Sequence, residues 1–86
     1  MIKNRSLIMT FAELVKKRRF ELGMSQFDLG VALNITPTTI SSWERGATKP
    51  QYDTLINLAK VLGVTELELL HPETIKEENE DSKNVQ

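Results

Sequence analysis

Hydrophobic residues recur along most of the chain at intervals of three and four, the spacing that places them on one face of an α-helix. Polar and charged residues fill the positions between them. Glycine, asparagine and proline residues interrupt the pattern and divide it into five predicted helices. These helices cover about residues 11–22, 26–33, 37–45, 52–62 and 66–70. The expected fold class is therefore all-α.

Good capping residues stand immediately before four of the predicted helices. A side-chain oxygen there can accept a hydrogen bond from a backbone N–H of the first turn, and an acidic residue three positions later can complete a capping box. The four residues are Thr10, Ser25, Thr36 and Thr65, with Glu13 and Asp28 as box partners of the first two. Gln51, before the fourth helix, is a poor cap. Gly23, Gly46 and Gly63 are suited to end three of the helices.

The stretch from Ser25 to Gly46 joins two of these helices by a tight turn. Asn34 enters positive φ at low cost and can make the turn, while Pro37 suits the first position of the next helix. In that helix Ile40 and Trp43 lie three residues apart and share an inner face. The opposite face carries small hydroxyls and one guanidinium, from Thr38, Thr39, Ser42 and Arg45. Such a helix is suited to the major groove of DNA.

This stretch resembles the helix-turn-helix of the Cro and phage-lambda-repressor-like family, also called the Xre family. The motifs that carry the resemblance are Ser25-Gln26, Ile40-Ser41, Trp43-Glu44-Arg45-Gly46, Lys49-Pro50, Leu58-Ala59 and Leu62-Gly63-Val64. The resemblance covers about residues 11–70. It implies a five-helix lambda-repressor-like DNA-binding domain in which the second and third helices form the helix-turn-helix.

The resemblance also implies which residues would contact DNA. Base readout would come from the start of the third helix and from one turn further on, at Pro37, Thr38, Thr39 and Ser42. Phosphate contacts would come from Ser25, Gln26, Thr36, Arg45 and Lys49. The family pattern further implies an inward ion pair between Arg19 and Glu44. That pair would tie the first helix to the recognition helix and cancel an acidic charge beside the DNA.

Two base-contact positions depart from the commoner pattern of the family. Relatives often carry Gln, Arg or Lys where this chain has Pro37 and Ser42, and neither residue can make the two-pronged contact of arginine with guanine. Readout would then lean on threonine methyl groups, single hydroxyl hydrogen bonds, bridging water and DNA shape. For Gln26, Arg45 and Lys49 the alternative is an ordinary solvated surface role.

The formal net charge of −1 hides a division along the chain. Residues 1–65 contain nine Lys or Arg and five acids, a net charge of +4, whereas residues 66–86 contain seven acids and two lysines, a net charge of −5. We therefore expect a flexible arm at 1–9, a helix-turn-helix DNA-binding domain at 10–71 and a disordered acidic tail at 72–86. Lys16, Lys17 and Arg18 are expected on a solvated basic face.

The composition speaks against several other classes of site and function. The chain has no cysteine, and its one histidine, His71, has no partner at metal-ligand spacing, so neither a disulfide nor a metal or other cofactor is expected. No apolar run reaches the ~20 residues of a membrane span, so no membrane association is expected. No nucleophile or acid–base constellation indicates an enzyme. The expected location is the cytoplasm.

Three hypotheses about function remain. The leading one is a sequence-specific double-stranded DNA-binding transcriptional regulator, most simply a repressor that acts as a homodimer on a palindromic operator. The alternative is an antitoxin-like protein that binds a toxin and represses its own promoter, and the acidic tail would suit such a protein partner. The third is a protein-interaction module that keeps the fold without binding DNA, and Gln26, Arg45 and Lys49 speak against it.

Overall fold

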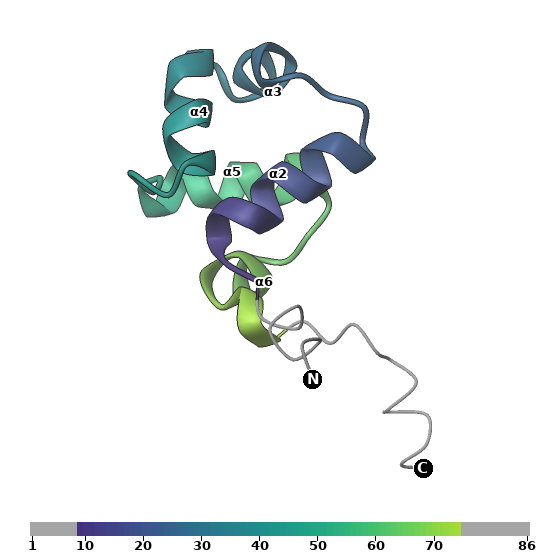
Figure 1. Cartoon of the computed structure of the whole chain (residues 1–86), viewed down its shortest axis with the longest axis vertical. Coiled ribbons are helices and arrows are strands. Elements are labelled where there is room, and N and C mark those ends of the chain that lie inside the picture. Colours follow the sequence, from purple (N-terminus) through teal and green to yellow (C-terminus); the bar gives the residue numbers. More distant parts are fainter. Residues whose placement is uncertain (1–8, 75–86) are drawn as a thin grey trace.

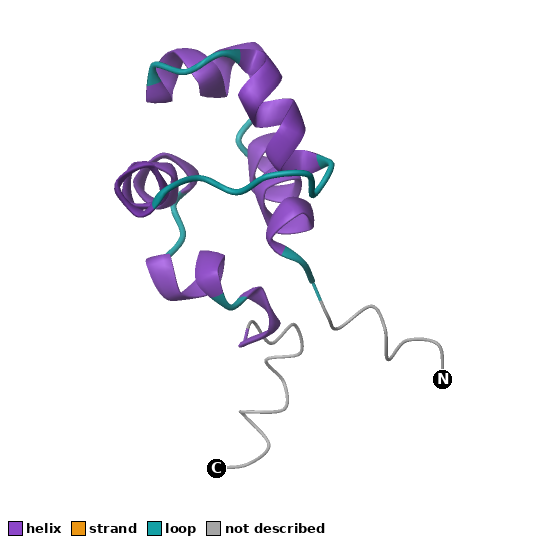
Figure 2. Ribbon diagram, turned by 90° about the vertical axis from the view of Figure 1, so that its left-hand side faces the viewer, coloured by secondary structure: helices purple, strands orange, loops and turns teal. Residues whose placement is uncertain are grey.

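The computed structural model describes residues 9–74, and every regular element in that range is a helix. The elements are α2 (Phe11–Glu21), α3 (Gln26–Leu33), α4 (Pro37–Glu44), α5 (Tyr52–Leu62), α6 (Glu66–Leu70) and a 3₁₀ turn η1 (Pro72–Thr74). Short loops connect them (Figure 2). The predicted five-helix, all-α fold is confirmed. Within the described range, no helix combines the length and apolarity needed to cross a bilayer.

The predicted capping residues begin the helices as expected. Capping boxes are present at Thr10 with Glu13, at Ser25 with Asp28, and at Thr65 with Glu68. In each box the hydroxyl accepts from a backbone N–H at 2.9–3.1 Å, and the carboxylate accepts from the N-cap N–H at 2.9–3.0 Å. Gln51 makes no side-chain capping bond before α5. Asn34 ends α3 with φ of 61°, in the left-handed region that the turn requires.

The hydrophobic core lies among α2, α3, α4 and α5, because α2 and α3 each pack against both α4 and α5. The helix α6 closes the core at the end of the molecule opposite α3 (Figure 1). The buried apolar residues of the core come from all five α-helices and are Phe11, Leu14, Val15, Leu29, Ile40, Trp43, Leu55, Leu58, Ala59, Leu62 and Leu69. Ile40 and Trp43 are buried, as their spacing predicted. Elsewhere on α4, Pro37 and Thr38 are exposed to solvent, while Thr39 and Ser42 are half-buried.

Two residues that stand just outside the expected domain boundaries pack with the described part of the fold. Met9, expected in the flexible arm, is half-buried and packs against the core. Pro72, expected to begin the acidic tail, is buried in the 3₁₀ turn after α6. The predicted limits of 10–71 therefore leave out one packed residue at each end. The remainder of the expected arm, 1–8, and of the expected tail, 75–86, lies outside the described residues.

Arg18 does not belong to a solvated basic face, and that expectation was wrong. Its Nε donates to the carbonyl oxygen of Leu62 at 2.9 Å, and its Nη1 pairs with Glu21 at 2.6 Å. Leu62 is the last residue of α5, whose final carbonyl groups have no partner within the helix. Arg18 therefore joins α2 to the carboxyl end of α5, where a positive charge also complements the helix dipole.

Gly30 occupies a position in α3 where the backbone of the following turn passes very close. A Cβ atom added at Gly30 would lie 2.6 Å from the carbonyl oxygen of Ile35 and 3.5 Å from the backbone nitrogen of Pro37. The Gly30 carbonyl in turn accepts a hydrogen bond from the Ile35 N–H at 2.9 Å. The missing side chain therefore allows α3 and the turn into α4 to approach each other.

Gly30→Ala should destabilise the protein, although alanine is normally the better helix former by about 0.5–1 kcal/mol. The 2.6 Å contact forces the turn backbone to move, and over-packing of this kind costs about 1–3 kcal/mol. We expect a net loss of about 1–2 kcal/mol, measured by urea unfolding with Trp43 fluorescence. Ala32→Gly, at an exposed position of the same helix, is the control and should lose about 0.5–1 kcal/mol. A Gly30→Ala protein at least as stable as wild type would contradict this account.

Candidate nucleic-acid interface

The two helices α3 and α4 lie together at the end of the molecule opposite α6 (Figure 1). The turn between them is closed by hydrogen bonds from the backbone N–H groups of Asn34 and Ile35 to carbonyl oxygens of α3. Thr36 then caps α4 by accepting from the Thr39 N–H at 3.3 Å, and Pro37 takes the first helical position. The sequence thus forms the expected helix-turn-helix, with a buried apolar face and an exposed polar face on α4.

The residues expected to contact bases differ in how far they are exposed on α4. Pro37 and Thr38 are exposed, while Thr39 and Ser42 are half-buried. The hydroxyl of Thr39 lies 3.0 Å from that of Thr36, and the hydroxyl of Ser42 lies 2.7 Å from that of Thr48. Two of the expected readers are therefore engaged in hydrogen bonds within the protein.

The residues expected to contact phosphates fall into two groups. Ser25, Gln26 and Thr36 stand at the amino ends of α3 and α4, where both hydroxyls accept capping bonds. Arg45 and Lys49 follow α4, and both are exposed. The Arg45 guanidinium donates to Ser41 Oγ at 2.7 Å, and the Lys49 ammonium lies 5.9 Å from the centre of the Phe11 ring. The first contact keeps the Arg45 guanidinium beside α4, and the second places the Lys49 ammonium beside Phe11, the first residue of α2.

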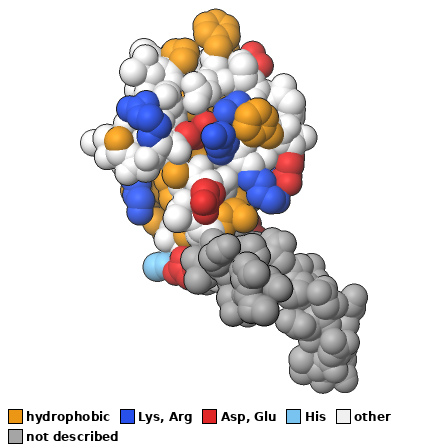
Figure 3. All heavy atoms as spheres, in the orientation of Figure 1, with side chains coloured by type: hydrophobic (Ala, Val, Ile, Leu, Met, Phe, Trp, Pro, Cys, Tyr) orange, Lys and Arg blue, Asp and Glu red, His pale blue; other side chains and the backbone are white. Residues whose placement is uncertain are grey.

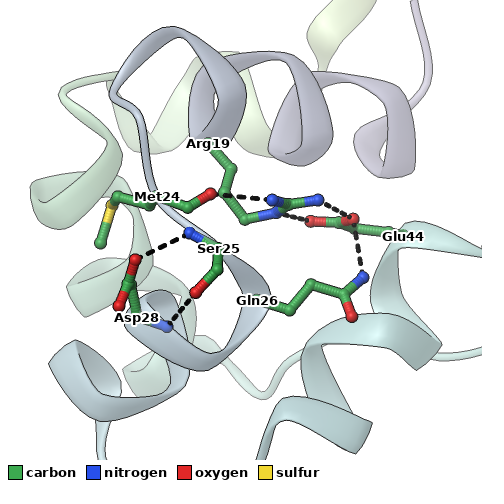
Figure 4. A network of polar contacts seen from close by, with 6 residues as sticks. All are labelled: Arg19, Met24, Ser25, Gln26, Asp28 and Glu44. Carbon is green, nitrogen blue, oxygen red and sulfur yellow. Dashed lines mark hydrogen bonds and ion pairs between the residues drawn. The ribbon is translucent and has the colours of Figure 1, made fainter.

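An ion pair joins Arg19 of α2 to Glu44 at the end of α4 (Figure 4). Arg19 Nε and Nη2 donate to the two carboxylate oxygens of Glu44 at 2.6 and 2.9 Å, and Nη1 donates to the carbonyl of Met24 at 2.8 Å. The Gln26 amide also donates to Glu44, at 3.1 Å. The two charged side chains are only 6% and 5% exposed. The pairing that the family resemblance implied is thus present, and it includes Gln26.

The ionisation of Glu44 is set by two opposing effects. Burial raises the pKa of its carboxyl. Hydrogen bonds from Arg19 and Gln26, together with the positive charges of Arg19 and Lys16, lower the pKa by more than burial raises it. The pKa therefore lies below the ordinary value of 4.5. The hydrogen bond to Glu44 likewise raises the pKa of Arg19. Both groups are charged at neutral pH, and the acidic charge at the end of α4 is neutralised inside the fold.

Two residues at this site were missed by sequence reasoning. Thr48 holds the Ser42 hydroxyl from the loop after α4, and Phe20 places its exposed ring 4.6 Å from the Arg19 guanidinium. Neither contact follows from helical periodicity, because Thr48 lies in a loop and Phe20 points away from the core. On the face seen in Figure 3, basic and acidic side chains are interspersed rather than gathered by sign. The described residues contain no cluster of His, Asp or Glu that could hold a metal ion.

Comparison with protein families matches residues 14–69, more than half of the chain, to a family described as helix-turn-helix. The chain belongs to the Cro/C1-type helix-turn-helix family. The family suggested by the sequence motifs is thereby confirmed.

Two curated relatives are named as HTH-type transcriptional regulators. The HTH-type transcriptional regulator DicA of Escherichia coli (strain K12) is 39% identical over 54 residues, which are 63% of this chain and 40% of DicA. The uncharacterized HTH-type transcriptional regulator YqaE of Bacillus subtilis (strain 168) is 34% identical over 55 residues, which are 64% of this chain and 47% of YqaE. The matched part of the chain thus spans less than half the length of either relative.

Solved structures show the same fold. The DNA-binding domain of the P22 c2 repressor matches with a TM-score of 0.69 and 32% identity, over 73% of this chain and 83% of that domain. The P22 c2 repressor in complex with a synthetic operator matches with a TM-score of 0.69 and 31% identity, over 71% and 92%. Hydroxypropylphosphonic acid epoxidase from S. wedmorenis matches with a TM-score of 0.63 and 37% identity, but over only 31% of that enzyme's chain.

Glu44→Ala should lower the free energy of unfolding by about 3–5 kcal/mol, because it leaves the guanidinium of Arg19 buried without its charged partner. The measurement is urea or thermal unfolding at pH 7. Glu21→Ala is the matched control, since Glu21 pairs with Lys17 and Arg18 at an exposed site, where such pairs contribute little. Equal stabilities of Glu44→Ala and wild type would mean that the buried pair does not support the fold.

The contribution of Glu44 should also depend on pH in a defined direction. Its pKa is lower in the folded protein, so the folded state binds fewer protons and its advantage is fully present above about pH 4.5. That advantage is lost as the pH falls through the folded-state pKa. The difference in unfolding free energy between wild type and Glu44→Gln should therefore shrink below about pH 4.5. A difference that stays constant from pH 7 to pH 3 would show that Glu44 is not the titrating group.

Proposed function

We propose that this chain binds double-stranded DNA with α4 in the major groove and regulates transcription, as a repressor that acts as a homodimer. The observation that carries the proposal is the disposition of α4, whose apolar side is buried through Ile40 and Trp43 while its hydroxyl-bearing side is presented to solvent. The likeness to the P22 c2 repressor, which was crystallised with a synthetic operator, supports the same conclusion. The names of DicA and YqaE support a regulatory role.

Phosphate contacts would fix the protein on the duplex. The amino ends of α3 and α4 present backbone N–H groups and the positive end of the helix dipole, which favour an anion. Gln26 stands at the first of these ends, with its amide oriented by Glu44. The amide has a second hydrogen that could reach a phosphate oxygen. Ser25 and Thr36 stand beside the same helix ends, while Arg45 and Lys49 supply positive charge after α4.

Base readout would come from Pro37, Thr38, Thr39 and Ser42, which begin and line the exposed side of α4. A buried Glu44 supports this placement, because a free carboxylate at the end of α4 would repel the DNA backbone. Its pairing with Arg19 removes that obstacle.

A homodimer on a palindromic operator is the assembly that we propose. One chain offers one recognition helix, and a two-fold axis would present a second copy to an inverted half-site about one helical turn away. The antitoxin alternative rests on the acidic segment, which lies mostly at residues 75–86, outside the described residues. No feature of the described residues favours that alternative.

The proposal is tested by selecting bound sequences from random duplexes and titrating variants against the selected and a scrambled duplex at two salt concentrations. We expect an inverted repeat to be enriched. Arg45→Ala should weaken binding to both duplexes alike and lower the slope of log affinity against log salt by about one unit, because a phosphate contact carries no sequence information. Thr38→Ala should instead lower the ratio of selected to scrambled affinity.

Lys60→Ala is the matched control for the loss of charge, because Lys60 is exposed in the last turn of α5, outside the proposed interface. It should keep the salt slope of wild type. Failure to enrich any sequence would overturn the proposed readout, and an enriched site without two-fold symmetry would overturn the homodimer. A change of ratio in Arg45→Ala but not in Thr38→Ala would show that α4 is oriented differently.

A further inference from the structure

The hydroxyl groups on the proposed base-contact face of α4 are largely engaged by the protein itself. The Thr39 hydroxyl lies 3.0 Å from the Thr36 hydroxyl, which also accepts from the Thr39 backbone N–H at 3.3 Å. The Ser42 hydroxyl lies 2.7 Å from the Thr48 hydroxyl. Among the proposed base-contact residues, Thr38 has the one hydroxyl with no hydrogen bond to the described part of the chain. To donate to or accept from a base, the engaged groups must share or break these bonds.

The same face has no side chain that can make two hydrogen bonds to one base. Guanine is most often read by Arg or Lys, and adenine by Asn or Gln. None of these residue types occurs among the four proposed base-contact residues. Gln26 and Arg45, at the margins of the helix-turn-helix, are held by Glu44 and Ser41. Hydrogen-bonded readout of the bases is therefore sparsely provided.

The proposed base-contact residues of α4 do carry aliphatic groups. Pro37 exposes its ring at the first position of α4, and the exposed side chain of Thr38 carries a methyl group. The half-buried Thr39 also carries a methyl group, and its hydroxyl is hydrogen-bonded to that of Thr36. In the major groove the matching apolar feature is the C5-methyl group of thymine.

We propose that α4 selects A·T base pairs by packing Pro37 and the methyl groups of Thr38 and Thr39 against thymine C5-methyl groups in each half-site. This inference rests on the proposed function and names the class of sequence that the site takes. Methyl contacts require no hydrogen-bond donor or acceptor, so they leave the bonds of Thr39 to Thr36 and of Ser42 to Thr48 intact. The unengaged hydroxyl of Thr38 is left for a single bond to a neighbouring base edge.

The test replaces each thymine of the selected site, one at a time, with uracil, which deletes the C5-methyl group and keeps pairing with adenine. We expect at least one thymine per half-site whose replacement weakens binding roughly fourfold, the effect of burying one methyl-sized group. Thymines outside the protected region are the control and should tolerate uracil. Affinities are measured by fluorescence anisotropy at fixed salt with the full chain.

Protein variants identify which methyl group is responsible. Thr39→Ser removes the methyl group and keeps a hydroxyl, whereas Thr39→Val keeps the methyl group and removes the hydroxyl. The same pair of variants is made at Thr38. At one of the two positions the Ser variant should become insensitive to uracil at a particular thymine, while the Val variant stays sensitive, as a double-mutant cycle measures. Thr54→Ser, in α5, is the control and should keep the full uracil effect.

Each outcome decides the matter. A selected half-site without thymine, or one in which uracil is tolerated throughout, overturns the methyl readout and leaves DNA binding standing. If the Ser variants stay sensitive to uracil while the Val variants no longer prefer the selected duplex, the hydroxyl groups read the bases. That result would also overturn the methyl readout. Failure of the folded protein to enrich any sequence would overturn the proposed function itself, so the two failures are distinguishable.

Discussion

The buried ion pair between Arg19 and Glu44 is the contact on which the geometry of the helix-turn-helix depends. An uncompensated charge in the interior is costly, so each partner needs a full set of hydrogen bonds. The guanidinium obtains them from Glu44 and from the carbonyl of Met24, immediately before the Ser25 cap. One side chain of α2 thus holds the start of α3 and the end of α4. A hydrophobic cluster of equal volume could match its stability, but it could not orient the Gln26 amide.

The two helices that the pair holds are too short to be stable alone. Each has eight residues, whereas isolated helices shorter than ~12–15 residues are marginal in water. Their stability comes from caps at Ser25 and Thr36, from the left-handed Asn34 and from buried apolar side chains. Gly30 lets the turn pass within contact distance of α3. Local chemistry therefore sets the shape of the turn, and the ion pair sets its placement on the rest of the fold.

The sequence predicted the features that depend on neighbouring residues and missed several contacts between residues far apart along the chain. Helix limits were predicted within about one residue; for example, the helix predicted at 37–45 is observed at Pro37–Glu44. The signals are local, because a capping bond spans three residues and a left-handed turn is made by a single residue. Contacts across 44 residues, such as Arg18 with Leu62, leave no trace in periodicity, and the expectation for Arg18 failed. The bond between Ser42 and Thr48 depends on the path of a loop. The Arg19–Glu44 pair came from family resemblance, since spacing alone does not specify a partner 25 residues away.

Stabilising a short recognition helix conflicts with leaving its hydroxyls free for DNA. A hydrogen bond within the protein contributes about 0.5–1.5 kcal/mol, so exchanging the Thr36–Thr39 bond for one to a base gains little. Methyl contacts avoid the exchange, but each discriminates only roughly fourfold. Two such contacts would give a half-site about 16-fold discrimination, and two independent half-sites about 250-fold. Because phosphate binding adds affinity for every sequence alike, readout of this kind would depend on a second copy of the chain for useful specificity. The homodimer that we propose would supply that second copy.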